Sequence, residues 1–120
     1  MVLDSKALLI LLRGESNHER VARALEQPCC ITTISLAVLF AELSGVLPRA
    51  LTDDLIRLGV EVVALDSSLT ADAAKLIAAG IPLEATFTLS LAHQRGLEIL
   101  LGERVINIPS DWKQKINTVR

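Results

Sequence analysis

Tyrosine is absent from this chain of 120 residues, and only 2% of the residues are aromatic. Proteins that hold single-stranded nucleic acid commonly stack its bases on aromatic side chains, so the usual stacking platform is missing. Excess positive charge is missing as well, since the net charge is −2 at pH 7. A surface of this average charge does not attract phosphate backbones. These absences argue against a general nucleic-acid-binding protein.

Long apolar runs are also absent, although 51% of the residues are hydrophobic. No unbroken stretch reaches about 18 residues, the length that a membrane-spanning helix needs. The opening Met-Val-Leu-Asp-Ser lacks the basic region that begins a signal peptide. We therefore expect a cytoplasmic protein with no membrane partner. The surplus of apolar side chains indicates either a rich core or a face buried in a homodimer.

Cysteine is scarce, and the two cysteines, Cys29 and Cys30, are neighbours. Adjacent cysteines form a disulfide only under strain, and two thiols alone do not make a structural zinc site. We expect both to be reduced and buried, as is usual in the cytosol. The sequence also has neither of the common glycine-rich phosphate loops. A cofactor-binding or signalling α/β domain is thereby disfavoured.

Strand-like and helix-like segments alternate along the chain. Apolar β-rich runs predict strands over residues 1–4, 29–33, 60–65 and 97–101. Helical spacing, caps and breakers predict helices over residues 7–13, 18–26, 35–44, 47–58, 70–79 and 84–95. This order predicts one α/β domain over residues 1–120, a three-layer α/β/α sandwich around a mostly parallel sheet. Residues 105–108 are a candidate short strand. We expect residues 111–120 to form a terminal helix or tail, with Trp112 anchoring the tail or a dimer contact.

Polar side chains follow several of the predicted strands. Asp4 ends the first strand, and α/β folds place their sites at that edge of the sheet. Ser5, Thr33 and Ser35 are candidates to line a pocket there, although such residues at strand–helix junctions are ordinarily helix caps. Asp66 is expected to be a helix cap. His18 and His93 are expected to be exposed.

Four segments together resemble a known family. They are residues 2–9 (VLDSKALL), 31–38 (ITTISLAV), 60–66 (VEVVALD) and 91–100 (LAHQRGLEIL). In this order and spacing they resemble the PIN domain, the small nuclease fold of VapC-type toxins in bacterial toxin–antitoxin pairs. The resemblance covers residues 1 to about 108 and implies a metal-dependent ribonuclease. Three or four carboxylates would hold Mg²⁺ or Mn²⁺, which prefer oxygen ligands.

The family's acids are only partly present in this chain. The first corresponds to Asp4, and the fourth corresponds to Glu103, a longer acid. The second corresponds to Val38 and the third to Ala85, so two of the four positions lack a carboxylate. Glu84 precedes Ala85 but lies about 100° round the helix, and we expect it to point elsewhere.

Two further residues bear on whether activity survives. Glu42 lies one turn beyond Val38 on the same helix face and is a candidate replacement acid. Lys6 stands where the family usually has a small polar residue. Its ammonium group is a candidate to neutralise Asp4 without a metal, although a solvated lysine at a helix start is equally compatible with the pattern.

Two functions therefore compete. In the first, the nuclease centre has decayed and the domain acts by protein association. In the second, the chain is an active Mg²⁺- or Mn²⁺-dependent endoribonuclease in which Asp4, Glu42 and Glu103 are catalytic and Asp4 and Glu103 bind the metal. RNA is a substrate only in the second case. An antitoxin would lay an amphipathic segment in an apolar groove, for which residues 8–13 and 35–43 are candidates, as they are for a homodimer face.

Overall fold

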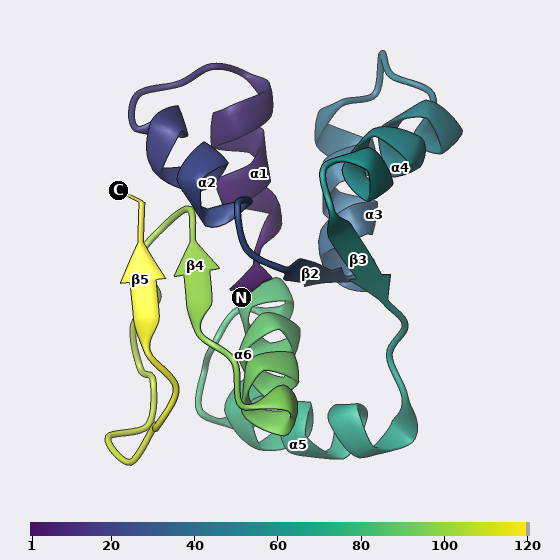
Figure 1. Ribbon diagram of the computed structural model, residues 1–120. Coiled ribbons are helices and arrows are strands. Elements are labelled where there is room, and N and C mark those ends of the chain that lie inside the picture. The colour runs from purple at the N-terminus through teal and green to yellow at the C-terminus, as the bar shows by residue number, and fades with distance from the viewer. Residues whose placement is uncertain (120) are drawn as a thin grey trace.

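Residues 1–119 of the chain are described by a computed structural model (Figure 1). Helices and strands alternate for most of the chain, as the sequence predicts. In chain order they are β1 (Val2–Leu3), α1 (Ser5–Leu12), α2 (His18–Ala24), β2 (Cys29–Thr32), α3 (Thr33–Glu42), α4 (Pro48–Arg57), β3 (Val60–Val63), α5 (Ser67–Ala78), α6 (Leu83–Arg95), β4 (Ile99–Leu101) and β5 (Ile116–Thr118).

The five strands form one sheet in the order β3-β2-β1-β4-β5, and every neighbouring pair is parallel. Val2 of β1 is paired with Cys30 on one side and Ile99 on the other. Because all strands run the same way, their carboxyl ends meet at one edge. Asp4 and Gly102 directly follow β1 and β4, and Thr32 ends β2 between them and β3, so all three residues are brought to that edge.

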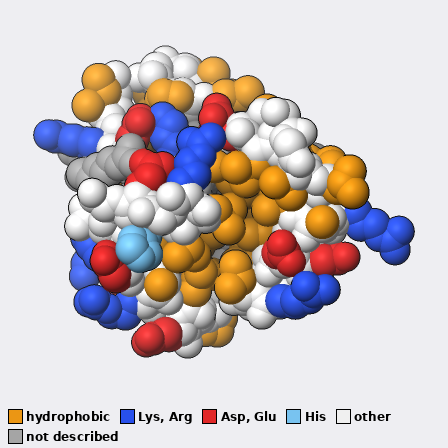
Figure 2. All heavy atoms as spheres, turned by 90° about the horizontal axis from the view of Figure 1, so that it is seen from above, with side chains coloured by type: hydrophobic (Ala, Val, Ile, Leu, Met, Phe, Trp, Pro, Cys, Tyr) orange, Lys and Arg blue, Asp and Glu red, His pale blue; other side chains and the backbone are white. Residues whose placement is uncertain are grey.

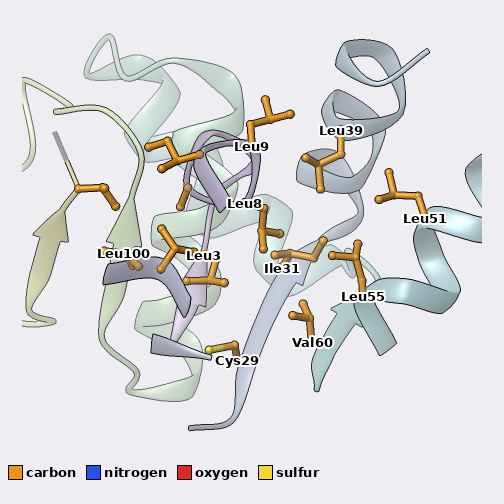
Figure 3. Packing of buried hydrophobic residues seen from close by; sticks show 14 residues of the cluster. Leu3, Leu8, Leu9, Cys29, Ile31, Leu39, Leu51, Leu55, Val60 and Leu100 are labelled. Atoms are coloured by element: carbon orange, nitrogen blue, oxygen red, sulfur yellow. The ribbon is translucent and has the colours of Figure 1, made fainter. Parts of the chain in front are cut away.

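Alternate strand residues face opposite sides of the sheet. Leu3, Ile31 and Leu100 pack in one buried cluster with residues of α1, α2, α3 and α4 (Figure 3). Val2 and Cys30 belong to a second cluster with residues of α5 and α6. In Figure 1 the first four helices lie on one side of the sheet and the last two on the other. The predicted three-layer α/β architecture is confirmed, with a sheet that is wholly parallel.

Three helices are capped by a polar residue that lies at the end of a strand or within three residues after it. The carboxylates of Asp4 and Asp66 accept hydrogen bonds from the backbone N–H groups of α1 and α5, each over 2.8 Å. The hydroxyl of Thr32 accepts one at the start of α3. Such caps satisfy N–H groups that a helix leaves unpaired. They also explain why α3 and α5 begin two or three residues earlier than their apolar periodicity predicts.

The C-terminal prediction is wrong in part. Between residues 111 and 119 the structure has strand β5 instead of a terminal helix, and residues 105–108 are irregular. Strand β5 pairs with the edge of β4, which supplies backbone partners that no local sequence pattern reveals. Val119 is buried beyond it and anchors this end of the chain. The last predicted position, residue 120, lies outside the described residues.

The cysteine prediction is confirmed, because Cys29 and Cys30 are free and buried. Burial raises the pKa of both thiols, which keeps them protonated and unreactive. Within residues 1–119, none of the helices has the length and apolar character needed to cross a membrane.

Candidate functional site

Asp4 lies buried at the junction of β1 and α1, only 6% exposed. Its Oδ1 accepts hydrogen bonds from the backbone N–H of Ala7 (2.8 Å) and from that of Gly102 (2.9 Å), just after β4. Burial raises the pKa of this carboxyl group to about 6, and the charge of Glu84 adds to the rise, against the lowering effect of the two N–H donors and of Lys6. A buried carboxylate with a raised pKa is typical of functional sites.

Glu84 reaches the same place from the first turn of α6. Its Oε1 accepts a hydrogen bond from the Ser5 hydroxyl, and its Oε2 accepts from the Ser5 backbone N–H and the Ser35 hydroxyl, each over 2.7 Å. The expectation that Glu84 points elsewhere is wrong. Helix α6 is turned so that Ala85 packs in the apolar cluster beneath the sheet, which leaves its neighbour to face α1 and α3. Ala85 therefore does not occupy the inward position.

Glu103 follows Gly102, and its partner is a cation. Its Oε2 accepts from the Lys6 ammonium group, and this bond is the main reason that the pKa of Lys6 is raised. Both side chains are about half exposed, at 50% and 55%. An ion pair this open to water contributes less than about 1 kcal/mol to stability. Its effect on the site is local: Lys6 neutralises Glu103.

A cleft of about 210 Å³ opens above these residues, between α1 and α3. Four of the predicted site residues line it together: Ser5, Lys6, Glu42 and Glu103. Glu42 does not turn toward Asp4 in this arrangement, since its carboxylate lies 3.4 Å from the Arg13 guanidinium group. The apolar part of the lining is made by Leu9, Ile10 and Val38, and Arg13 and Glu15 complete it.

The two predicted pocket residues of α3 differ in their placement. Ser35 is buried and binds Glu84. Thr33 is exposed in the first helical turn and does not line the cleft, so this expectation is wrong. The inward position belongs to Thr32, whose hydroxyl caps α3 and donates to Ser35. Thr32 is both the last residue of β2 and the N-cap of α3, and residue type alone does not distinguish it from Thr33.

The divalent metal that the resemblance implies can be tested against these donors. Between residues 1 and 119, no group of three or more His, Cys, Asp or Glu side chains is placed to hold a metal ion. Both oxygens of Glu84 accept hydrogen bonds, one oxygen of Asp4 does so, and Glu103 is paired with Lys6. A hard cation of this kind usually takes at least six oxygen ligands, including several from protein or substrate. In this arrangement the residues do not fit such an ion.

Comparisons with known proteins agree with this fold. The PIN domain family model matches residues 1–105. Among solved structures, a toxin–antitoxin complex from Klebsiella pneumoniae is similar, with a TM-score of 0.69 and 16% identity over 85% of each chain. At that identity the likeness shows the fold alone. No curated protein matches the chain at a significant level. The match of the family model over most of the sequence means that this chain belongs to the PIN domain family.

Proposed function

We propose that this PIN domain has an impaired or lost metal-dependent nuclease centre and acts in the cytoplasm by binding a protein partner. The observation that carries the proposal is the state of the carboxylates. Glu103 is paired with Lys6, Glu84 is bound by two serines, and Val38 and Ala85 offer no oxygen where the family has acids. Without a cation, converging carboxylates repel one another, by about 1 kcal/mol or more per pair at about 4 Å. The Lys6 ammonium group and the hydroxyls of Ser5 and Ser35 relieve that repulsion without a metal.

An active Mg²⁺- or Mn²⁺-dependent endoribonuclease is the second candidate. One observation favours it: Glu84 accepts two hydrogen bonds from Ser5, the residue that follows Asp4, and its charge raises the pKa of Asp4. Two carboxylates therefore still meet at the carboxyl ends of the strands. In that case Asp4, Glu84 and Glu103 replace the predicted set of Asp4, Glu42 and Glu103, because Glu42 is directed to Arg13.

Metal binding and RNA cleavage separate the two candidates. We expect calorimetric titration of the protein with Mn²⁺ and Mg²⁺ to show no tight site, and we expect incubation with structured and single-stranded RNA to give no EDTA-sensitive cleavage. A double variant, Lys6→Ser with Val38→Glu, removes the ammonium group that is paired with Glu103 and adds a carboxylate to the lining of the cleft. It is expected to gain Mn²⁺ affinity relative to the unchanged chain. Tight Mn²⁺ binding by the unchanged protein, with cleavage that Asp4→Asn abolishes, would reject the proposal.

The partner is proposed to bind the face made by α1 to α4. Figure 2 shows this face, where hydrophobic side chains gather in a central hollow with charged groups around it. Leu12, at the end of α1, is 39% exposed, although it is a large hydrophobic side chain. The cleft lining carries three acids (Glu15, Glu42 and Glu103) against two bases, Lys6 and Arg13. An amphipathic segment with an apolar ridge and a basic residue complements this surface.

One solved structure similar to this chain is a toxin–antitoxin complex, which supports an antitoxin-like small protein as that partner. A second copy of this chain is the other occupant that the sequence suggests. The two are distinguished by the molar mass of the purified protein, alone and when coexpressed with any small protein encoded immediately upstream. A stable heterocomplex supports the antitoxin, and a dimer of the isolated chain supports self-association.

A pair of variants tests the position of this surface. Leu12→Glu places a charge at the exposed end of α1, and we expect it to weaken the complex by about tenfold or more. Ile77→Glu is the matched control, because Ile77 is similarly exposed (45%) but lies on α5, across the sheet. If Ile77→Glu weakens the complex and Leu12→Glu does not, the partner binds the opposite face.

A further inference from the structure

A second and larger cavity lies on the other side of the sheet from the cleft. It is an open hollow lined by residues of α5 and α6 and by residues 109–113, which lead into β5, and its volume is about 390 Å³. Small-molecule sites usually measure about 300 to 1,000 Å³, a range that includes this cavity and excludes the cleft of about 210 Å³ beside Asp4. The nuclease centre and the proposed partner surface do not use it.

Two ring-bearing side chains line this cavity. Trp112, the single tryptophan, lines it together with His93. Their ring centroids are 5.8 Å apart and the planes are tilted by 44°. Leu76 and Pro109 extend the apolar wall. A flat apolar surface of this kind accepts a stacked heterocyclic ring, and stacking on tryptophan is tolerant of the identity of the base.

Four charged residues surround the same cavity, two of each sign. They are Lys75 and Lys113, and Asp72 and Asp111. Across residues 1–119 none of the four makes an ion pair or side-chain hydrogen bond with another residue. Two ammonium groups are suited to a phosphate. Two carboxylates accept hydrogen bonds from hydroxyl or amino groups. The Ser90 hydroxyl donates to the Thr86 carbonyl, so its oxygen also remains able to accept.

We propose that this cavity is a binding site for a nucleoside monophosphate. The base stacks on Trp112, the phosphate is bound by Lys75 and Lys113, and Asp72 and Asp111 accept hydrogen bonds from ribose hydroxyls or an exocyclic amino group. The combination of aromatic surface, paired cations and paired carboxylates around one hollow supports this ligand class over a free anion or an apolar compound. The proposal does not depend on nuclease activity or on the partner surface.

Trp112 provides the measurement, because its fluorescence is the only tryptophan signal of the chain. We expect AMP and UMP to change that fluorescence saturably at micromolar to millimolar concentrations, with matching heats in calorimetry. Lys75→Ala and Lys113→Ala should each weaken binding about tenfold, equivalent to about 1.4 kcal/mol. Lys115→Ala is the matched control, since this exposed lysine is close in sequence to Lys113 but does not line the cavity. The affinity of the Lys115→Ala variant for AMP and UMP should be unchanged.

Separate titrations with inorganic phosphate and with adenosine decide the ligand class. Weaker binding of both than of AMP supports the assignment, because each lacks one half of the recognised molecule. Phosphate that binds as tightly as AMP would overturn it in favour of a simple anion site. Adenosine that binds as tightly as AMP would remove the role given to the lysines. The absence of both heat and fluorescence change with every nucleotide would overturn the proposal entirely. Weakening by Lys115→Ala equal to that by the other two variants would also overturn it.

Discussion

Replacing Gly102 by alanine is expected to lower the free energy of unfolding by on the order of 3 kcal/mol. A Cβ atom at this position would lie 2.4 Å from the Cβ of Lys6, 2.5 Å from its carbonyl carbon and 2.6 Å from the Ala7 nitrogen. Two of these atoms are backbone, so the clash is relieved only by separating α1 from the end of β4. That movement also breaks the hydrogen bond from the Gly102 N–H to Asp4. Urea unfolding at neutral pH measures the loss.

Gly45→Ala is the matched control for this substitution. Gly45 has no positive φ, and a Cβ there would meet no atom within 4 Å. Alanine at such a glycine leaves the folded state unstrained and reduces the freedom of the unfolded chain, so a gain of about 0.4 to 1 kcal/mol is expected. If Gly102→Ala is as well tolerated as Gly45→Ala, the close approach of β4 to α1 is not as described.

Replacing Asp4 by asparagine is expected to stabilise the protein at neutral pH, by about 2 to 3 kcal/mol. Burial raises the pKa of the Asp4 carboxyl from 3.8 to about 6, so the folded state disfavours its charge. Asparagine is neutral, and its side-chain oxygen can accept the same hydrogen bonds from the N–H groups of Ala7 and Gly102. Its amide group can donate toward Glu84. Urea unfolding at about pH 7 tests the gain.

The pH dependence of the free energy of unfolding also tests the raised pKa of Asp4, with Glu103→Gln as the control. Because the carboxyl pKa is higher in the folded state than in the unfolded state, the folded protein binds this proton more tightly. The stability that Asp4 contributes is full below about pH 4 and is lost as the pH rises to about 6. Asp4→Asn should abolish this part of the profile. Glu103→Gln should retain it, because Glu103 is an exposed partner of Lys6. A profile unchanged by Asp4→Asn contradicts the raised pKa.

The two substitutions address one property of the site. The carboxyl end of β4 lies so close to the start of α1 that no methyl group fits at Gly102. Asp4 is buried at this junction, where its negative charge is unfavourable. Retention of a destabilising charge at a tightly packed junction is typical of functional sites, where activity is maintained against stability. In this chain the acids that remain are satisfied by serine hydroxyls and a lysine.

The strands and most helices follow from local chemistry. Short apolar runs, helical apolar spacing, and polar caps after the strands specify the elements before any tertiary contact forms. Asp66 illustrates this, because its capping role is predicted from its position alone and is confirmed by its 2.8 Å hydrogen bond to the Leu69 N–H. Strand β5 illustrates the opposite case, in which no local pattern specifies the element. Its backbone is extended because it pairs with the free edge of β4, about 15 residues earlier in the chain.

The site divides in the same way. The sequence by itself determined a parallel α/β sandwich of the PIN family, the presence of Asp4 at its first strand end, and the missing acids at Val38 and Ala85, because these depend on residue types and on spacing along one element. Only the tertiary structure decided that Glu84 turns inward to Ser5 and Ser35, that Lys6 pairs with Glu103, and that Thr32 instead of Thr33 faces the site. The rotation of a helix about its axis is set by packing against its neighbours, and a difference of about 100° per residue decides which side chain enters a site.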